Sequence, residues 1–285
     1  MMRKILVPVR GDGKGDNVLA HAAALARGSN AHITVAHCRA RPEDLMPFGV
    51  PLPAMLKKQM LESAAKVSDV EEESLRKELE ALSKVLKLKP SDVPDNKNVT
   101  VSFVEEAGRQ VDVIRRNGRL ADVIAVAKPD VDRNLGTNTL KAALFRTGRP
   151  VLMCPKPSGD APQILGQNIT VAWNGSLEAT RAVALTTGLM KSAKTVTILT
   201  TDAADVSNGA EELQSYLAYH GIEAKIAHAS GSRTVAKNLL ATSRELGADL
   251  MIMGAYGDSH ERETIFGGNT QYVVDHAEMP VILVH

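Results

Sequence analysis

The sequence predicts an α/β fold with two doubly wound, Rossmann-like domains, each built on a five-stranded parallel sheet with helices on both faces. Two observations predict it: short apolar runs alternate with segments of helical periodicity, and this alternation occurs twice along the chain. Strands that are apolar throughout are typical of parallel sheets buried on both faces. At 285 residues the chain also has the length of two ordinary domains.

Several segments of the first half match segments of the second half in sequence. The matched pairs are 4–9 with 168–173, 32–37 with 195–200, 121–125 with 248–252, and 149–153 with 279–283. A helix rich in small residues follows the first strand of each half, over 16–28 and 177–191. Each half is therefore expected to alternate strands with helices and to end on a fifth strand.

A stretch rich in Pro and Gly separates the halves, because 156–162 cannot continue a strand or a helix. We expect a first domain over 1–155, a linker over 156–167 and a second domain over 168–285.

The first half also carries a helical insert over 41–97. We expect two helices there, over 54–67 and 69–88, with Ser68 and Glu71 at the spacing of a capping box. The insert either covers one face of the sheet or forms an arm that binds a partner.

The composition is that of an ordinary globular protein and argues against two classes of partner. Apolar residues make up 44% and charged residues 24%, with a formal net charge of +1. This charge gives no electrostatic basis for binding nucleic acid or an anionic membrane, and no apolar run reaches the roughly 18 residues that span a bilayer. Two cysteines, Cys38 and Cys154, are too few for a disulfide framework. The first residues run into a strand without the apolar core of a signal peptide, so a cytoplasmic location is expected.

The most informative segment lies between the apolar strand at 249–253 and the helix expected over 271–276. Its glycines are Gly254, Gly257, Gly267 and Gly268. Glycines after a strand let the backbone turn tightly and approach a ligand closely. The free N–H groups at a helix N-terminus suit a phosphate. The segment therefore predicts a cradle for the phosphates of a nucleotide.

The opposite wall of this site is expected from the end of the first strand of the same half. Asn174, followed by Gly175, is placed to bond a base or ribose edge, and Ser176 is a candidate N-cap. The alternative for this segment is a simple turn and helix cap that needs no ligand.

Two arginines are candidate phosphate contacts. Arg233 follows Gly231 and Ser232 at the start of the third crossover, and Arg262 lies in the charged loop 258–263. The alternative for both is a solvated side chain. His260 and its flanking carboxylates do not have the spacing of a metal site.

Together these residues make the whole chain resemble a tandem member of the universal stress protein family. The family's ATP-binding motif is Gly, two residues, Gly, nine residues, Gly, then Ser or Thr. Three glycines of this chain match it in spacing: Gly254, Gly257 and Gly267. Gly268 stands where the motif has Ser or Thr. The alternatives for the missing hydroxyl are substitution by Asn269 or Thr270 and phosphate binding by backbone N–H groups alone.

The resemblance implies further properties. The fold would be that of the adenine nucleotide alpha hydrolase-like proteins, and the ligand would be ATP, with Mg²⁺ as an optional companion. Family members often carry Asp, which contacts the adenosine, where this chain has Asn174. Thr201 aligns with a backbone contact to the adenine.

The first half departs from the motif much further. Residues 127–130 read Ala-Lys-Pro-Asp where the glycine turn belongs, and only Gly136 remains of the later glycines. Pro129 cannot imitate a glycine turn, because its ring fixes φ and restricts the residue before it. We expect no ATP in the first half, which would have a structural or regulatory role.

The favoured function is a stress-response protein whose second domain binds an adenine nucleotide as a sensor or switch. The sequence has no Walker loop ending in Gly-Lys-Ser/Thr and no nucleophile elbow, so slow ATP hydrolysis is the most chemistry expected. One alternative is an interaction or scaffold protein in which both sites have decayed, and a weaker one is an adenylate-processing enzyme. The family's domains often pair through their fifth strands, here 151–154 and 281–284, and further homodimerisation is expected.

Overall fold

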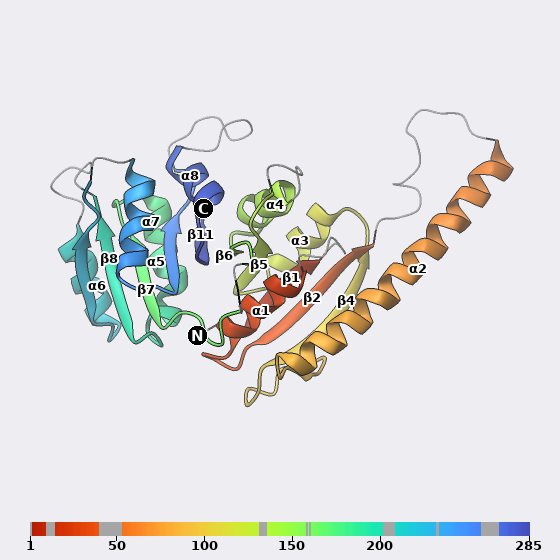
Figure 1. The fold of residues 1–285 in the computed structure, drawn as a ribbon, viewed down its shortest axis with the longest axis horizontal. Coiled ribbons are helices and arrows are strands. Elements are labelled where there is room, and N and C mark those ends of the chain that lie inside the picture. Colours follow the sequence, from red (N-terminus) through yellow and green to blue (C-terminus); the bar gives the residue numbers. More distant parts are fainter. Residues whose placement is uncertain are drawn as a thin grey trace.

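The computed structural model describes residues 2–9, 15–39, 53–130, 136–157, 159, 161–201, 209–231, 234–257 and 268–285. Within them, eleven strands form one sheet with helices on both faces (Figure 1). The strand order is β3-β4-β2-β1-β5-β6-β11-β10-β7-β8-β9. The predicted α/β class is therefore confirmed, and the two halves of the chain share one continuous sheet.

The first half contributes the strands from β3 to β6 in this order. Its elements are β1 (Lys4–Val9), α1 (Gly15–Ala26), β2 (His32–Arg39), α2 (Ala54–Val85), β3 (Lys89–Pro90), β4 (Thr100–Ala107), α3 (Gln110–Gly118), β5 (Val123–Ala127), α4 (Thr137–Thr147) and β6 (Val151–Cys154). The two-residue β3 pairs with β4 at the edge of the sheet and was not expected from the sequence. It contains Pro90, which a sheet accommodates at its edge because proline cannot donate to the ladder.

The second half has the five parallel strands that the sequence predicts. Its elements are β7 (Asn168–Ala172), α5 (Leu177–Met190), β8 (Thr195–Thr200), α6 (Ala210–Tyr219), β9 (Ala224–His228), α7 (Val235–Glu245), β10 (Leu250–Gly254), α8 (Gly268–His276) and β11 (Val281–Val284).

The two halves join where β6 and β11 pair in antiparallel fashion, with Val281 opposite Met153 and Leu283 opposite Val151. This is the pairing through the fifth strands that the family resemblance implies, made within one chain. Both strands are fully buried. Since alternate residues of a strand face opposite sides, Ile282 contributes to the core on one face and Leu283 to the core on the other.

The long crossover of the first half is one helix, α2, and not the two helices predicted. Ser68 lies inside it, so the expected capping box does not start a new helix. The sequence between the two expected helices contains no Gly or Pro, and a lone serine costs a helix only a few tenths of a kcal/mol. The C-terminal turns pack Leu79, Leu82 and Leu86 against the core. The first turns project beyond the sheet with Met55 75% exposed (Figure 1).

None of the helices in the described ranges is both long and apolar enough to cross a membrane. The predicted linker lies partly within these ranges and runs along α1. The backbone N–H of Leu165 donates to the Ala24 carbonyl, and the Arg27 guanidinium donates to the Gln163 carbonyl.

An aspartate at the same place in each half holds the start of the first strand. Asp122 precedes β5 in the first half, and Asp249 precedes β10 in the second half. The Asp249 carboxylate accepts hydrogen bonds from the backbone N–H groups of Gly166, Gln167 and Asn168, at 2.9 to 3.2 Å. Asp122 accepts from those of Arg3 and Lys4 in the first half. Each carboxylate thus fixes the chain where the first strand of its half begins.

We expect Asp249→Ala to destabilise the protein by about 1–3 kcal/mol, because it leaves three backbone donors without their acceptor. The midpoint of urea unfolding followed by circular dichroism measures this loss. Glu245→Ala removes an exposed carboxylate at the end of α7 and serves as the control. Equal midpoints for the two variants would contradict the assigned role.

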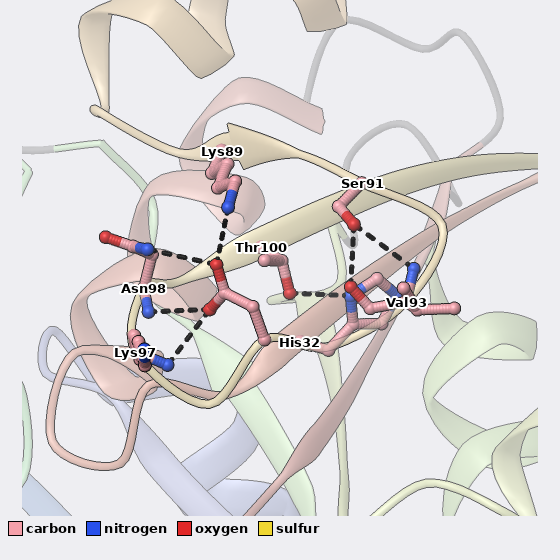
Figure 2. A network of polar contacts seen from close by, with 8 residues as sticks. His32, Lys89, Ser91, Val93, Lys97, Asn98 and Thr100 are labelled. Atoms are coloured by element: carbon pink, nitrogen blue, oxygen red, sulfur yellow. Dashed lines mark hydrogen bonds and ion pairs between the residues drawn. The ribbon is translucent and has the colours of Figure 1, made fainter.

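A second polar network lies in the first half (Figure 2). It is found at the amino ends of β2 and β4. Asp95 accepts from Lys89 Nζ at 2.7 Å and from the backbone N–H groups of Lys97 and Asn98. These bonds fold the loop after β3 back on itself, and Lys89 is the main reason that the pKa of Asp95 is well below its usual range. The buried imidazole of His32 lies nearby.

His32 is held by two hydroxyl groups of β4. Its Nδ1 lies 2.8 Å from Thr100 Oγ1 and its Nε2 lies 3.0 Å from Ser102 Oγ. Burial lowers the pKa of His32, and Lys4 lowers it further against an opposing effect of Asp92. Burial also lowers the pKa of His21, although its bond to the Asn17 carbonyl opposes this.

These shifts predict that the protein loses stability as the pH falls below about 6.5, the pKa of an unperturbed histidine. Below that pH the unfolded chain binds protons that folded His32 and His21 resist, so protonation favours unfolding. Thermal midpoints between pH 8 and pH 5 measure the effect. The pH dependence should be smaller in His32→Gln. An identical dependence in both proteins would contradict the prediction.

Candidate functional site

The candidate site lies where the winding of the second half reverses. From β7 the chain moves outward to β8 and β9 and then returns to β10, which lies on the other side of β7. Met253 of β10 pairs with Ala172 of β7, so Gly254 and Trp173 lie next to each other where these strands end. In open parallel sheets, ligands bind at such a reversal beyond the carboxyl ends of the strands.

The glycine turn after β10 is built mainly by packing. A Cβ atom on Gly254 would lie 2.5 Å from Ala179 N and 2.6 Å from Glu178 C, so glycine lets the first turn of α5 rest on the end of β10. The residue with left-handed backbone is Tyr256, at φ 60°, and not one of the glycines. Its ring is buried and lies 5.2 Å from that of Phe145 on α4. The sequence alone gave Gly254 a ligand-binding reason, whereas the structure gives it a packing reason.

Asn174, Gly175 and Ser176 form a turn and a helix cap, which confirms Ser176 as an N-cap and leaves ligand binding by Asn174 a prediction. Asn174 Oδ1 accepts from the N–H of Ser176 at 3.1 Å, and Gly175 has a φ of 73°. Ser176 Oγ accepts from the N–H of Ala179 and caps α5. Asn174 is exposed at the mouth of the site.

Thr201 follows β8 and Gly231 follows β9. Because these strands are parallel neighbours, both residues lie beyond the carboxyl ends of the strands. Thr201 is half-buried. The Asn238 side chain donates to the Gly231 carbonyl at 3.3 Å, and a Cβ on Gly231 would lie 2.9 Å from Asn238 Oδ1. Glycine at position 231 therefore allows the close approach of the Asn238 side chain on α7. Arg233, Arg262 and Gly267 lie outside the described residues.

The first turn of α8 forms the remaining wall. Thr270 is buried, and its Oγ1 accepts from the N–H of Tyr256 at 3.2 Å, so this hydroxyl supports the turn. Gly268 and Asn269 are exposed. No atom of the described residues lies within 4 Å of a Cβ on Gly268, so packing against them does not require glycine there.

Glu178 is a residue of the site that sequence reasoning missed. It lies in the first turn of α5, and its Oε2 would be 2.6 Å from a Cβ atom on Gly257. Its position in a first helical turn suggests only a favourable interaction with the helix dipole. That its carboxylate reaches the glycine turn follows from the pairing of β7 with β10, which sequence does not show.

The described residues contain no group of three or more His, Cys, Asp or Glu side chains that could hold a metal ion. A divalent cation at this site would therefore need most of its oxygen ligands from a bound phosphate chain and from water.

The comparisons with known proteins decide the family. The model of the universal stress protein family matches residues 1–130 and 166–285. The chain belongs to the universal stress protein family.

Solved structures of universal stress proteins share the fold of the whole chain. A universal stress protein from Archaeoglobus fulgidus DSM 4304 is 18% identical with a TM-score of 0.69, and the match covers 99% of this chain and 95% of that one. A putative universal stress protein from Pseudomonas aeruginosa UCBPP-PA14 is 17% identical with a TM-score of 0.55, over 99% and 93% of the two chains. No curated protein is significantly similar in sequence.

The corresponding turn of the first half of this universal stress protein is packed against its surroundings. Lys128 is half-buried, and its Nζ donates to the Ala277 carbonyl just after α8 at 2.9 Å. Burial lowers the pKa of Lys128. A Cβ on Gly136 would lie 3.3 Å from Pro129 Cα, so the start of α4 lies against the proline. The segment that replaces the glycine turn thus contacts the second half and the start of α4.

The two turn glycines should respond differently to alanine. Gly254→Ala forces the backbone of α5 to shift and should cost about 1–3 kcal/mol of stability. For Gly257→Ala, the nearest described atoms are at the end of the Glu178 side chain, which can rotate, so the cost should be within about 0.5 kcal/mol. Urea unfolding of both variants tests this. Equal losses would show that packing against α5 does not explain Gly254.

Proposed function

We propose that this universal stress protein binds an adenine nucleotide, ATP in the first instance, in its second half, as a sensor or switch in a stress response. The observation that carries the proposal is the meeting of the turn at Gly254–Gly257 with the exposed first turn of α8, beyond the ends of β7 and β10. A helix N-terminus beside a close-approaching backbone is a favourable place for phosphate. The cytoplasmic location stays a prediction of the sequence.

The proposed contacts divide between the two ends of the ligand. Asn174, Gly175, Thr201 and Gly231 would line the adenosine side, because they follow β7, β8 and β9. Gly257, Gly268 and Asn269 would face the phosphates, with Gly254 and Thr270 supporting the turn. Arg262 and Gly267 remain candidate phosphate contacts from the sequence.

The proposal includes little catalysis. The sequence has no Walker loop and no nucleophile elbow, so slow hydrolysis by water is the most chemistry that we propose. A sensor then depends on a difference in conformation between nucleotide states. The first half is proposed to bind no nucleotide and to support the second half.

One set of observations favours a second candidate, an interaction protein without nucleotide. Gly254 is explained by packing, the Thr270 hydroxyl supports the turn, and the Glu178 carboxylate faces Gly257. The chain would then act through its surface, as a monomer or as the homodimer that we expect from the family resemblance.

Mass spectrometry of the small molecules released from gently purified, denatured protein tests the proposal first. We expect about one adenine nucleotide per chain, and we expect added ATP to change the fluorescence of Trp173, which borders Gly254. Gly257→Val should abolish both signals while folding is kept, because its side chain fills the turn. Photocrosslinking of ATP should label 168–285 and not 1–155.

Gly268→Ser is a variant in which we expect ATP binding to become tighter, in contrast to the loss expected in Gly257→Val. The open space at this position accepts the side chain, and a hydroxyl that donates to a phosphate should tighten ATP binding by about tenfold. No released nucleotide and no fluorescence change up to millimolar ATP, in wild type and in Gly268→Ser, would favour the interaction protein.

A further inference from the structure

The Glu178 side chain occupies a particular place in the proposed site. Its main chain packs on Gly254, and its carboxylate lies over Gly257 on the side where a Cβ atom would point. The side chain is half-buried. It makes no hydrogen bond or ion pair with another described residue. A carboxylate without a partner among the described residues therefore lies against the backbone that is proposed to hold phosphate.

The position also explains why the carboxylate is tolerated there. Glu178 belongs to the first turn of α5, whose free N–H groups and dipole favour a negative charge. A phosphate at the Gly257 turn would approach the same helix end and would be repelled by the charge already present. Two like charges a few ångströms apart in a partly buried site disfavour each other strongly.

We propose that Glu178 is a specificity-determining residue of the nucleotide site, because its carboxylate opposes a bare polyphosphate at the Gly257 turn and admits one that carries a divalent cation. The inference rests on the proposed function. Mg²⁺ prefers oxygen ligands and is commonly held by one or two carboxylates together with phosphates. With Mg²⁺ between them, the carboxylate and the phosphates attract instead of repelling. Adenosine, which has no phosphate, should be insensitive to Glu178.

The test compares wild type, Glu178→Gln and Glu245→Gln by isothermal titration calorimetry with adenosine, with ATP in EDTA, and with ATP in excess Mg²⁺. Glu245→Gln is the matched control, since it removes the same charge from the far end of α7. In Glu178→Gln we expect metal-free ATP to bind at least tenfold tighter, which corresponds to about 1.4 kcal/mol. Adenosine affinity should change less than twofold, and the gain for ATP should shrink or reverse in Mg²⁺.

Circular dichroism and thermal midpoints of each variant show whether the fold is kept, and Glu178→Asp gives a second variant that keeps the charge but withdraws it from the turn. Its affinity for metal-free ATP should fall between those of wild type and Glu178→Gln. Equal affinity of wild type and Glu178→Gln for metal-free ATP, with binding present, would overturn the role of Glu178 alone. Absence of binding of every ligand to both proteins would overturn the proposed function together with this inference.

Discussion

The antiparallel pairing of β6 with β11 is the interaction on which the arrangement of the molecule depends. Both strands are buried along their whole length, and their alternate residues enter the cores on opposite faces of the sheet. Without this pairing, each half would end on an apolar edge strand with unpaired backbone groups, which invites association with other chains. The last strand of each half is therefore covered by the last strand of the other half, and the two halves form one sheet.

The segments that follow β5 and β10 make different contacts at this junction. In the first half, Lys128 reaches the carbonyl of Ala277 across the junction, and Pro129 lies against the start of α4. In the second half, Tyr256 packs against Phe145 from the other side. The asymmetry seen in the sequence thus has a structural counterpart, because the segment that follows the fourth core strand makes different contacts in the two halves.

Much of the fold could be predicted from sequence because its signals are local: apolar runs, helical periodicity and their repetition. The predictions that failed depend on weaker signals. A capping-box spacing at Ser68 did not divide α2, since no breaker stands beside it. The location of a site at this edge of the sheet stays a prediction, and the nearness of Glu178 to Gly257 was not predicted. It depends on which residues of β7 and β10 lie side by side, and this register is a property of the folded chain.

A glycine motif in a sequence does not distinguish packing from binding, and the structure shows which of these glycines packing explains. Gly254 is needed by the backbone of α5, the left-handed position belongs to Tyr256, and Thr270 holds the turn in place. Among the described residues, the atoms nearest to a Cβ on Gly257 belong to the Glu178 side chain, and none lies within 4 Å of a Cβ on Gly268. Packing against the described residues therefore does not account for Gly257 and Gly268, which are the two positions of the loop left to the proposed ligand. Since Glu178 faces the first of these, the proposed site should be sensitive to the charge of its ligand.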